Sequence, residues 1–212
     1  RRRHTRFRNV TGVQTCALPI SAPAVTALKL AHLRRDRPYC EAALATSSLQ
    51  HTPVPVLSSF KGCTVENAIR IDARDPGFSS SFHASCALSV GMAMFIRHVV
   101  QPAARRRLGS EVARIDHLGT FACRPMIGGR TTPAALSEHA AANAIDIKGF
   151  VLRDGRTVTV ARNWAHDDPS GRFLHEVRDG ACRIFKVVLS PDFNQAHWTH
   201  FHLDMGRSSA CR

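Results

Sequence analysis

Two short polar stretches, far apart in the chain, constrain the fold more than any other feature. His139 is followed seven residues later by Asp146, and a second pair, His200 and His202, lies near the C-terminal end. Two imidazoles and one carboxylate from separate segments are typical ligands of a catalytic zinc, because three protein ligands leave a fourth position for water. Such a metal acidifies water and polarises a carbonyl group, which is the chemistry of peptide hydrolysis. A fold that uses this chemistry must bring both stretches together.

The spacing of the last histidines indicates a strand over residues 199–205, in which His200 and His202 share one face. One imidazole can then bind the metal while the other meets the substrate. The chain contains 12 histidines, so the spacing alone also fits structural or surface histidines. Asp204 would lie on the same face, either orienting an imidazole or as a surface carboxylate at the strand end. His197 either lines the cleft or forms a hydrogen bond with a ligand histidine.

The N-terminal segment is treated separately from the rest of the chain. Residues 10–20, VTGVQTCALPI, look like a translated sequencing adapter, so we expect residues 1–20 to be an artefact. A targeting segment is disfavoured, because the apolar stretch 16–20 is shorter than a signal-peptide core of about 7–15 residues. We expect any genuine signal peptide to have been lost. Residues 21–38 are predicted to be a linker or disordered start, and residues 39–212 to form one domain.

Composition excludes several classes of protein. Without the five arginines among residues 1–20, 24 basic residues face 16 acidic ones, so the net charge falls from +13 to +8. The apolar content of 44% suffices for a proper core, and no run approaches the roughly 20 apolar residues that span a membrane. We find no nucleic-acid-binding motif and predict no specific nucleic-acid partner. A cationic surface suits a polyanionic cell envelope.

Six cysteines remain once Cys16 is set aside: Cys40, Cys63, Cys86, Cys123, Cys182 and Cys211. Their number is even, they are widely spaced, and no C-x-x-C pair suggests a zinc ribbon or a redox motif. This pattern favours disulfides in an oxidising compartment, and therefore a periplasmic or secreted protein. Buried free thiols are the alternative. The sequence does not choose among the many possible pairings.

Hydrophobic patterns predict alternating helices and strands. Residues 51–60 read as irregular because Pro, His and Ser interrupt them. Gly155, after Asp154, indicates a hairpin turn. The predicted helices are 84–104, closed by Pro102 and Gly109, and 171–188, and the predicted strands are 63–71, 111–121, 146–151, 156–161 and 199–205. A loop or helical turn at residues 137–143 would carry the first candidate ligand.

Five motifs in order resemble the extensin-like C-terminal domain family. They are VQPAA at 100–104, GTFACR at 119–124, LSEHAAANAIDIKGF at 136–150, VRDGACR at 177–183 and HFHLD at 200–204. The resemblance covers about residues 38–212. This family is similar to zinc D-Ala-D-Ala peptidases, lysostaphin-type endopeptidases and the hedgehog signalling domain. The resemblance implies an α+β fold, in which helices flank a small antiparallel sheet carrying a zinc site, and a bacterial periplasmic location.

The resemblance also implies roles for individual residues. One Zn²⁺ per chain would be bound by His139, Asp146 and His202, in an S-x-H-x6-D motif and at the second histidine of H-x-H. His200 would stabilise the reacting carbonyl or its oxyanion. Arg124 would bind the substrate or polarise its carbonyl, and Ser137 would support the ligand loop.

One position departs from the family pattern. Thr199 stands three residues before the last candidate ligand, where related peptidases carry an acidic base. A neutral hydroxyl is no base near neutral pH, although His200 could replace it. The candidate ligands and the resemblance together predict a zinc-dependent peptidase-like domain that works by a metal-activated water. Peptidoglycan stem peptides as its substrate are what the resemblance alone implies. The alternatives are a zinc-stabilised, non-catalytic envelope-binding module, which Thr199 favours, and a disulfide-rich structural protein without metal.

Overall fold

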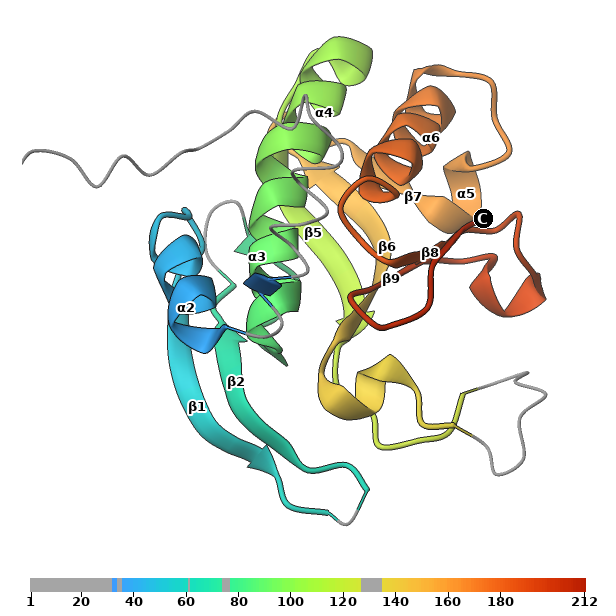
Figure 1. Ribbon diagram of the computed structural model, residues 1–212. Coiled ribbons are helices and arrows are strands. Elements are labelled where there is room, and N and C mark those ends of the chain that lie inside the picture. The colour runs from blue at the N-terminus through green and yellow to red at the C-terminus, as the bar shows by residue number, and fades with distance from the viewer. Residues whose placement is uncertain (1–31, 34–35, 61, 74–76, 127–134) are drawn as a thin grey trace, which may run out of the picture.

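A computed structural model describes residues 32–33, 36–60, 62–73, 77–126 and 135–212 (Figure 1). The predicted artefact at residues 1–20 and residues 21–31 of the predicted linker lie outside this range. Helix α2 (Arg37–Ala45) begins at Asp36, whose carboxylate accepts a hydrogen bond from the Tyr39 N–H at 2.9 Å. None of the helices in the described ranges has the length and apolar character to span a membrane.

The larger of two sheets carries the candidate site. Within the described residues it has seven strands in the order β10-β8-β9-β6-β5-β3, with β7 paired to β6. The strands are β3 (Gly77–Phe78), β5 (Val112–Gly119), β6 (Ala144–Leu152), β7 (Thr157–Thr159), β8 (Val187–Leu189), β9 (Phe201–Asp204) and β10 (Ala210–Cys211). The α+β class is confirmed. The sheet is larger than expected, and it is mixed, because β3 pairs with β5 and β10 with β8 in parallel.

A second, antiparallel sheet contains β1 (His51–Ser58), β2 (Val65–Ile71) and β4 (Phe82–Ala84) in the order β1-β2-β4. The prediction that residues 51–60 are irregular was therefore wrong. Pro53 and Pro55 are compatible with β1 because it is an edge strand, on which a missing N–H leaves no neighbouring strand unpaired. Ile69 and Ile71 of β2 point into the core and are almost fully buried.

The long helical segment passes through the proline that was expected to end it. It comprises α3 (Cys86–Phe95), the π-helical turn η1 (Ile96–Val100) and α4 (Gln101–Leu108). Pro102 lies in the first turn of α4, directly after the π turn, where the hydrogen-bond ladder is already interrupted. The helix ends at Gly109, whose φ of +67° is a left-handed conformation that glycine adopts without strain.

The helices pack over one part of the larger sheet, with α4 beside α6 (Pro169–Ala181) and the short α5 (Val160–Asn163) nearby (Figure 1). Helix α6 ends earlier than predicted, since residues 187–189 form β8. Fully buried aromatic rings join the two layers: Phe150 of β6 lies edge-on to Phe173 of α6, with 5.2 Å between ring centroids. Each such ring contributes about 2–3 kcal/mol through burial.

The six cysteines considered above form three disulfides, which confirms the prediction that they pair. Cys40–Cys86 joins α2 to α3, Cys63–Cys123 joins the β1–β2 turn to the segment after β5, and Cys182–Cys211 joins the end of α6 to β10. Disulfides persist in oxidising compartments, so this arrangement fits a secreted or extracellular protein.

Candidate metal centre

Two of the predicted ligands lie directly opposite each other in the larger sheet. Asp146 of β6 pairs with His202 of β9 in antiparallel register, and Asp146 Oδ1 lies 3.0 Å from His202 Nδ1. Their side chains are 16% and 13% exposed, so both are largely removed from water yet reachable from one side. The sheet register alone therefore brings a carboxylate and an imidazole together.

The third predicted ligand, His139, comes from the 3₁₀ turn η2 (Glu138–Ala141). The Ser137 hydroxyl accepts a hydrogen bond from the His139 N–H at 3.3 Å and so begins this turn. His139 Nε2 lies 3.3 Å from both His202 Nδ1 and Asp146 Oδ2. One ligand atom from each of the three side chains lies within 4.8 Å of the others, so the group could hold a metal ion.

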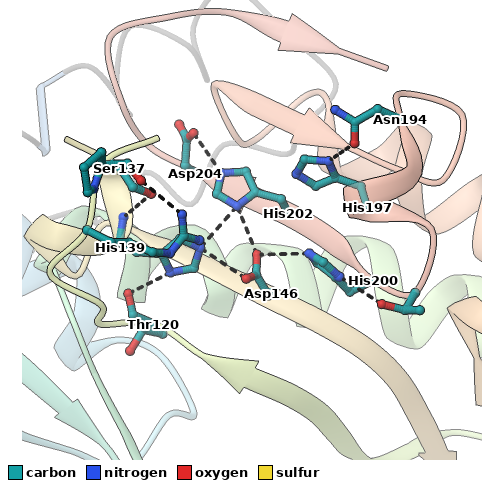
Figure 2. A network of polar contacts seen from close by, with 12 residues as sticks. Thr120, Ser137, His139, Asp146, Asn194, His197, His200, His202 and Asp204 are labelled. Atoms are coloured by element: carbon teal, nitrogen blue, oxygen red, sulfur yellow. Dashed lines mark hydrogen bonds and ion pairs between the residues drawn. The ribbon is translucent and has the colours of Figure 1, made fainter. Parts of the chain in front are cut away.

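Each imidazole has its other ring nitrogen occupied by a partner outside the group (Figure 2). His139 Nδ1 donates to the Thr120 carbonyl at 3.0 Å, and His202 Nε2 donates to Asp204 Oδ2 at 3.2 Å. These contacts turn the remaining lone pairs toward Asp146, as carbonyl and carboxylate partners do for metal-binding histidines. Two nitrogens and one carboxylate oxygen suit zinc. Sequence reasoning missed Thr120, because a main-chain carbonyl leaves no trace in side-chain identity.

The charges of the group are strongly coupled. Burial by itself raises the pKa of the Asp146 carboxyl, but its hydrogen bonds with His139 and His202 outweigh burial and hold that pKa well below its ordinary value. Burial by itself lowers the pKa of His202, but hydrogen bonds with Asp146 and Asp204 raise it to about 9. Without metal, His202 is therefore protonated near neutral pH, and its positive charge offsets part of the negative charge of Asp146 and Asp204.

His200 lies beside the group rather than in it. Strand β9 begins at Phe201, so His200 precedes the strand that was expected to start at residue 199. Its Nε2 is 3.7 Å from Asp146 Oδ1, and its Nδ1 is 3.2 Å from the Thr199 hydroxyl. Burial is the main cause that lowers the pKa of His200, so its neutral form dominates at neutral pH.

His197 stands at the edge of the same cluster, in the 3₁₀ turn η3 (Gln195–His197). Its Nδ1 lies 2.7 Å from Asn194 Oδ1, and its ring centroid is 5.5 Å from that of His200 and 6.0 Å from that of His202. Burial, followed by the electrostatic effects of His200 and His202, lowers the pKa of His197 to about 4. His197 therefore lies in ring contact with His200 and His202, and the choice between its two predicted roles stays a prediction.

Arg124 follows β5 and is half-buried. Its carbonyl accepts a hydrogen bond from the Ser137 N–H at 3.1 Å, which ties it to the start of η2. Its guanidinium donates to the Pro125 carbonyl at 3.3 Å, and its charge contributes to the lowered pKa of His197. Within the described ranges of the chain, no carboxylate pairs with this guanidinium, so it can receive an anionic or carbonyl group.

The fold and these contacts define an α+β domain with a His/Asp/His group that could hold a metal ion. Residues 38–212 match the family described as the extensin-like protein C-terminus, and the chain belongs to that family. Neither the comparison with curated proteins nor that with solved structures gives a match.

Proposed function

We propose that this protein is a zinc-dependent, peptidase-like hydrolase that acts on peptidoglycan stem peptides in the periplasm or outside the cell. The observation that carries the proposal is that the ligand atoms of His139, Asp146 and His202 lie close together. Each of the two imidazoles is also oriented by a hydrogen bond to a residue outside this group. Zinc held by such a group supplies a Lewis acid that polarises a carbonyl and acidifies water. The three disulfides support an extracytoplasmic location, and the peptidoglycan substrate rests on the family resemblance.

His200 is suited to stabilise a developing oxyanion. When the Thr199 hydroxyl donates to Nδ1, the ring proton resides on Nε2, which faces Asp146 Oδ1 at 3.7 Å. A fixed N–H beside the reacting carbonyl stabilises charge that appears only in the transition state. Arg124, with a planar guanidinium at the edge of the site, would bind a carboxylate or carbonyl of the substrate.

The second candidate function is a zinc-stabilised module that binds the cell envelope without cutting it. Thr199 supports it, because the position expected to hold an acidic base carries a neutral hydroxyl. The carboxylate of the nearby Glu138 accepts a hydrogen bond from Asn143 Nδ2 at 2.7 Å, a contact that directs it to Asn143. Under the first function, the hydrolase, His200 would have to take the proton from the attacking water.

The two functions are separated by measuring bound metal and released products on the same sample. The chain is produced in an oxidising host, zinc per chain is determined, and purified peptidoglycan is incubated with it, with His202→Ala as control. One zinc per chain and His202-dependent release of peptides supports the hydrolase. One zinc without products supports the binding module. Absence of zinc would contradict both and leave a disulfide-rich structural domain.

A further inference from the structure

Asn143 joins the turn of one candidate ligand to the strand of another. It lies between η2, which carries His139, and β6, which begins at Ala144 and carries Asp146. Its side chain is half-buried, and it is not one of the three residues that could hold the metal. Its polar groups contact three separate parts of the fold.

The first contact is with Glu138, the first residue of η2. The Asn143 N–H donates to the Glu138 carbonyl at 2.9 Å, and Asn143 Nδ2 donates to Glu138 Oε2 at 2.7 Å. The main chain and the side chain of Glu138 are thus both bound to one residue, which closes the turn that carries His139. The link between the side chains has a direction, because the amide nitrogen only donates and the ionised carboxylate only accepts.

The second contact is with the start of α3. Ser85 begins this helix, since its hydroxyl accepts a hydrogen bond from the Leu88 N–H at 3.1 Å. The same hydroxyl donates to Asn143 Oδ1 at 2.7 Å, and the Ser85 N–H donates to the Ala142 carbonyl at 2.7 Å. The next residue, Cys86, joins α3 to α2 through its disulfide. The segment between two candidate ligands is therefore fixed to a helix of the core.

The third contact is with the end of β9, the strand of the third candidate ligand. The Asn143 carbonyl accepts a hydrogen bond from the Met205 N–H at 3.1 Å. The Glu138 side chain lies against the following residue, Gly206, where an added Cβ would be only 2.5 Å from Glu138 Oε1. The Gly206 N–H donates in turn to Asp204 Oδ1 at 2.8 Å. Asn143 and Glu138 together therefore brace the end of β9.

We propose that Asn143 and Glu138 are positioning residues of the metal centre, which hold the segments of all three candidate ligands in one arrangement. The pair closes the turn of His139, precedes the strand of Asp146 and braces the strand of His202. Hydrogen-bond partners outside the ligand group commonly change metal affinity about 10- to 100-fold, because they decide whether the ligands are already in place. The inference deepens the proposed function, and it rests on the metal site but not on the hydrolytic step.

The test reverses the direction of the link between the two side chains. Asn143→Asp places two carboxylates against each other and breaks the link. Glu138→Gln in the same chain restores it, because the glutamine amide donates to the new carboxylate, and the double variant keeps the net charge of the wild type. We expect Asn143→Asp to weaken zinc binding about 10- to 100-fold, and the double variant to return to within about threefold of the wild type. The added negative charge would by itself favour a cation, so a weaker affinity reports the geometry.

Chelator competition measures the zinc affinity, and the visible absorption of Co²⁺ bound in place of zinc reports the ligand geometry. The Co²⁺ spectrum should change in Asn143→Asp and return in the double variant, which a purely fold-stabilising role would not produce. Glu66→Gln combined with Asn67→Asp makes the same changes on two exposed neighbours in β2, and this matched control should bind zinc normally. If Asn143→Asp does not fold, Glu138→Ala, at a half-buried side chain, tests the same link and should weaken zinc binding about tenfold.

Wild-type affinity and an unchanged Co²⁺ spectrum in Asn143→Asp would overturn the inference, and so would a double variant that binds as weakly as Asn143→Asp. A lower melting temperature with wild-type affinity and spectrum would overturn it too, since the pair would then serve the fold alone. The proposed hydrolysis is judged separately, on purified peptidoglycan. If that substrate stays intact while the reversal weakens and restores metal binding, the hydrolase fails and the positioning role stands. If it is cleaved while all variants bind metal equally, the positioning role is wrong and the hydrolase stands. A wild-type protein that binds no metal would contradict both.

Discussion

Asp146 and His202 lie directly opposite each other on β6 and β9, with 3.0 Å between Asp146 Oδ1 and His202 Nδ1. Side chains of opposed residues on antiparallel strands share one face of the sheet. A slip of one residue between the strands would turn His202 to the other face and separate it from Asp146. The pairing register of the sheet is therefore itself a requirement for the candidate metal centre.

Asp204→Asn should weaken zinc binding about 10- to 100-fold without unfolding the protein. The carboxylate accepts a hydrogen bond from His202 Nε2, while its other oxygen accepts one from the Gly206 N–H at 2.8 Å. An amide oxygen can keep the second contact but lacks the charge that increases the basicity of His202. Chelator competition measures the affinity, and Asp167→Asn, on a carboxylate that is 92% exposed and paired with Arg172, is the control. Equal affinities for both variants would contradict a role for Asp204 in orienting His202.

Zinc affinity should rise with pH up to about pH 9. In the metal-free fold, burial lowers the pKa of His202, but the hydrogen bonds with Asp146 and Asp204 raise it from 6.5 to about 9. The stabilisation from this proton is complete below pH 6.5 and is lost as the pH rises through about 9. Zinc needs the neutral imidazole and must displace the proton, so its affinity should increase about tenfold per pH unit in this window.

Competition titrations at several pH values between 6.5 and 9 would show this slope, and calorimetry in buffers of different ionisation enthalpy would count the released proton. In Asp204→Asn, the loss of one hydrogen-bond partner should lower the pKa of His202, so the slope should level off at a lower pH. A flat pH profile in the wild-type protein would show that zinc does not replace a proton on His202.

Thr199→Asp should increase the rate of peptidoglycan hydrolysis about 100-fold, because a carboxylate beside His200 supplies the missing base. The Thr199 hydroxyl is already 3.2 Å from His200 Nδ1, so the new side chain starts close to the reacting groups. Thr199→Asn has the same shape without the charge and should show no gain. Released peptides are quantified by mass spectrometry. If neither variant releases more product than the wild type, the binding module becomes the better account.

Replacement of Cys182 and Cys211 by serine should lower the free energy of unfolding by about 2–4 kcal/mol. This disulfide closes 29 residues of sequence separation and fixes β10 beside β8, which in turn pairs with β9 and its His202. Urea denaturation under non-reducing conditions measures the change. Zinc affinity should fall less than it does in Asp204→Asn, because β8 and β9 keep their own pairing. A loss of zinc binding equal to that of His202→Ala would show that the Cys182–Cys211 disulfide is needed to form the site.

Several elements followed from local pattern alone. The Asp154–Gly155 turn, the strand around Ile147 and the turn carrying His139 are confirmed, because turn residues and alternating apolar positions report local backbone preferences. Strand β1 was missed because its prolines are acceptable only at a sheet edge, and edge position is a property of the assembled sheet. Likewise, Pro102 did not end the helix, because a π turn before it removed the conflict.

For the candidate site, the sequence by itself determined which residues have the right chemistry: His139, Asp146 and His202, and the six cysteines that remain besides Cys16. Only the tertiary structure decided how they are used. It selected one of many cysteine pairings, placed His200 before the strand, and brought the Thr120 carbonyl to His139. The physical reason is that side-chain identity is local, whereas a distance between atoms 56 or 63 residues apart depends on the register of strands and the packing beneath them.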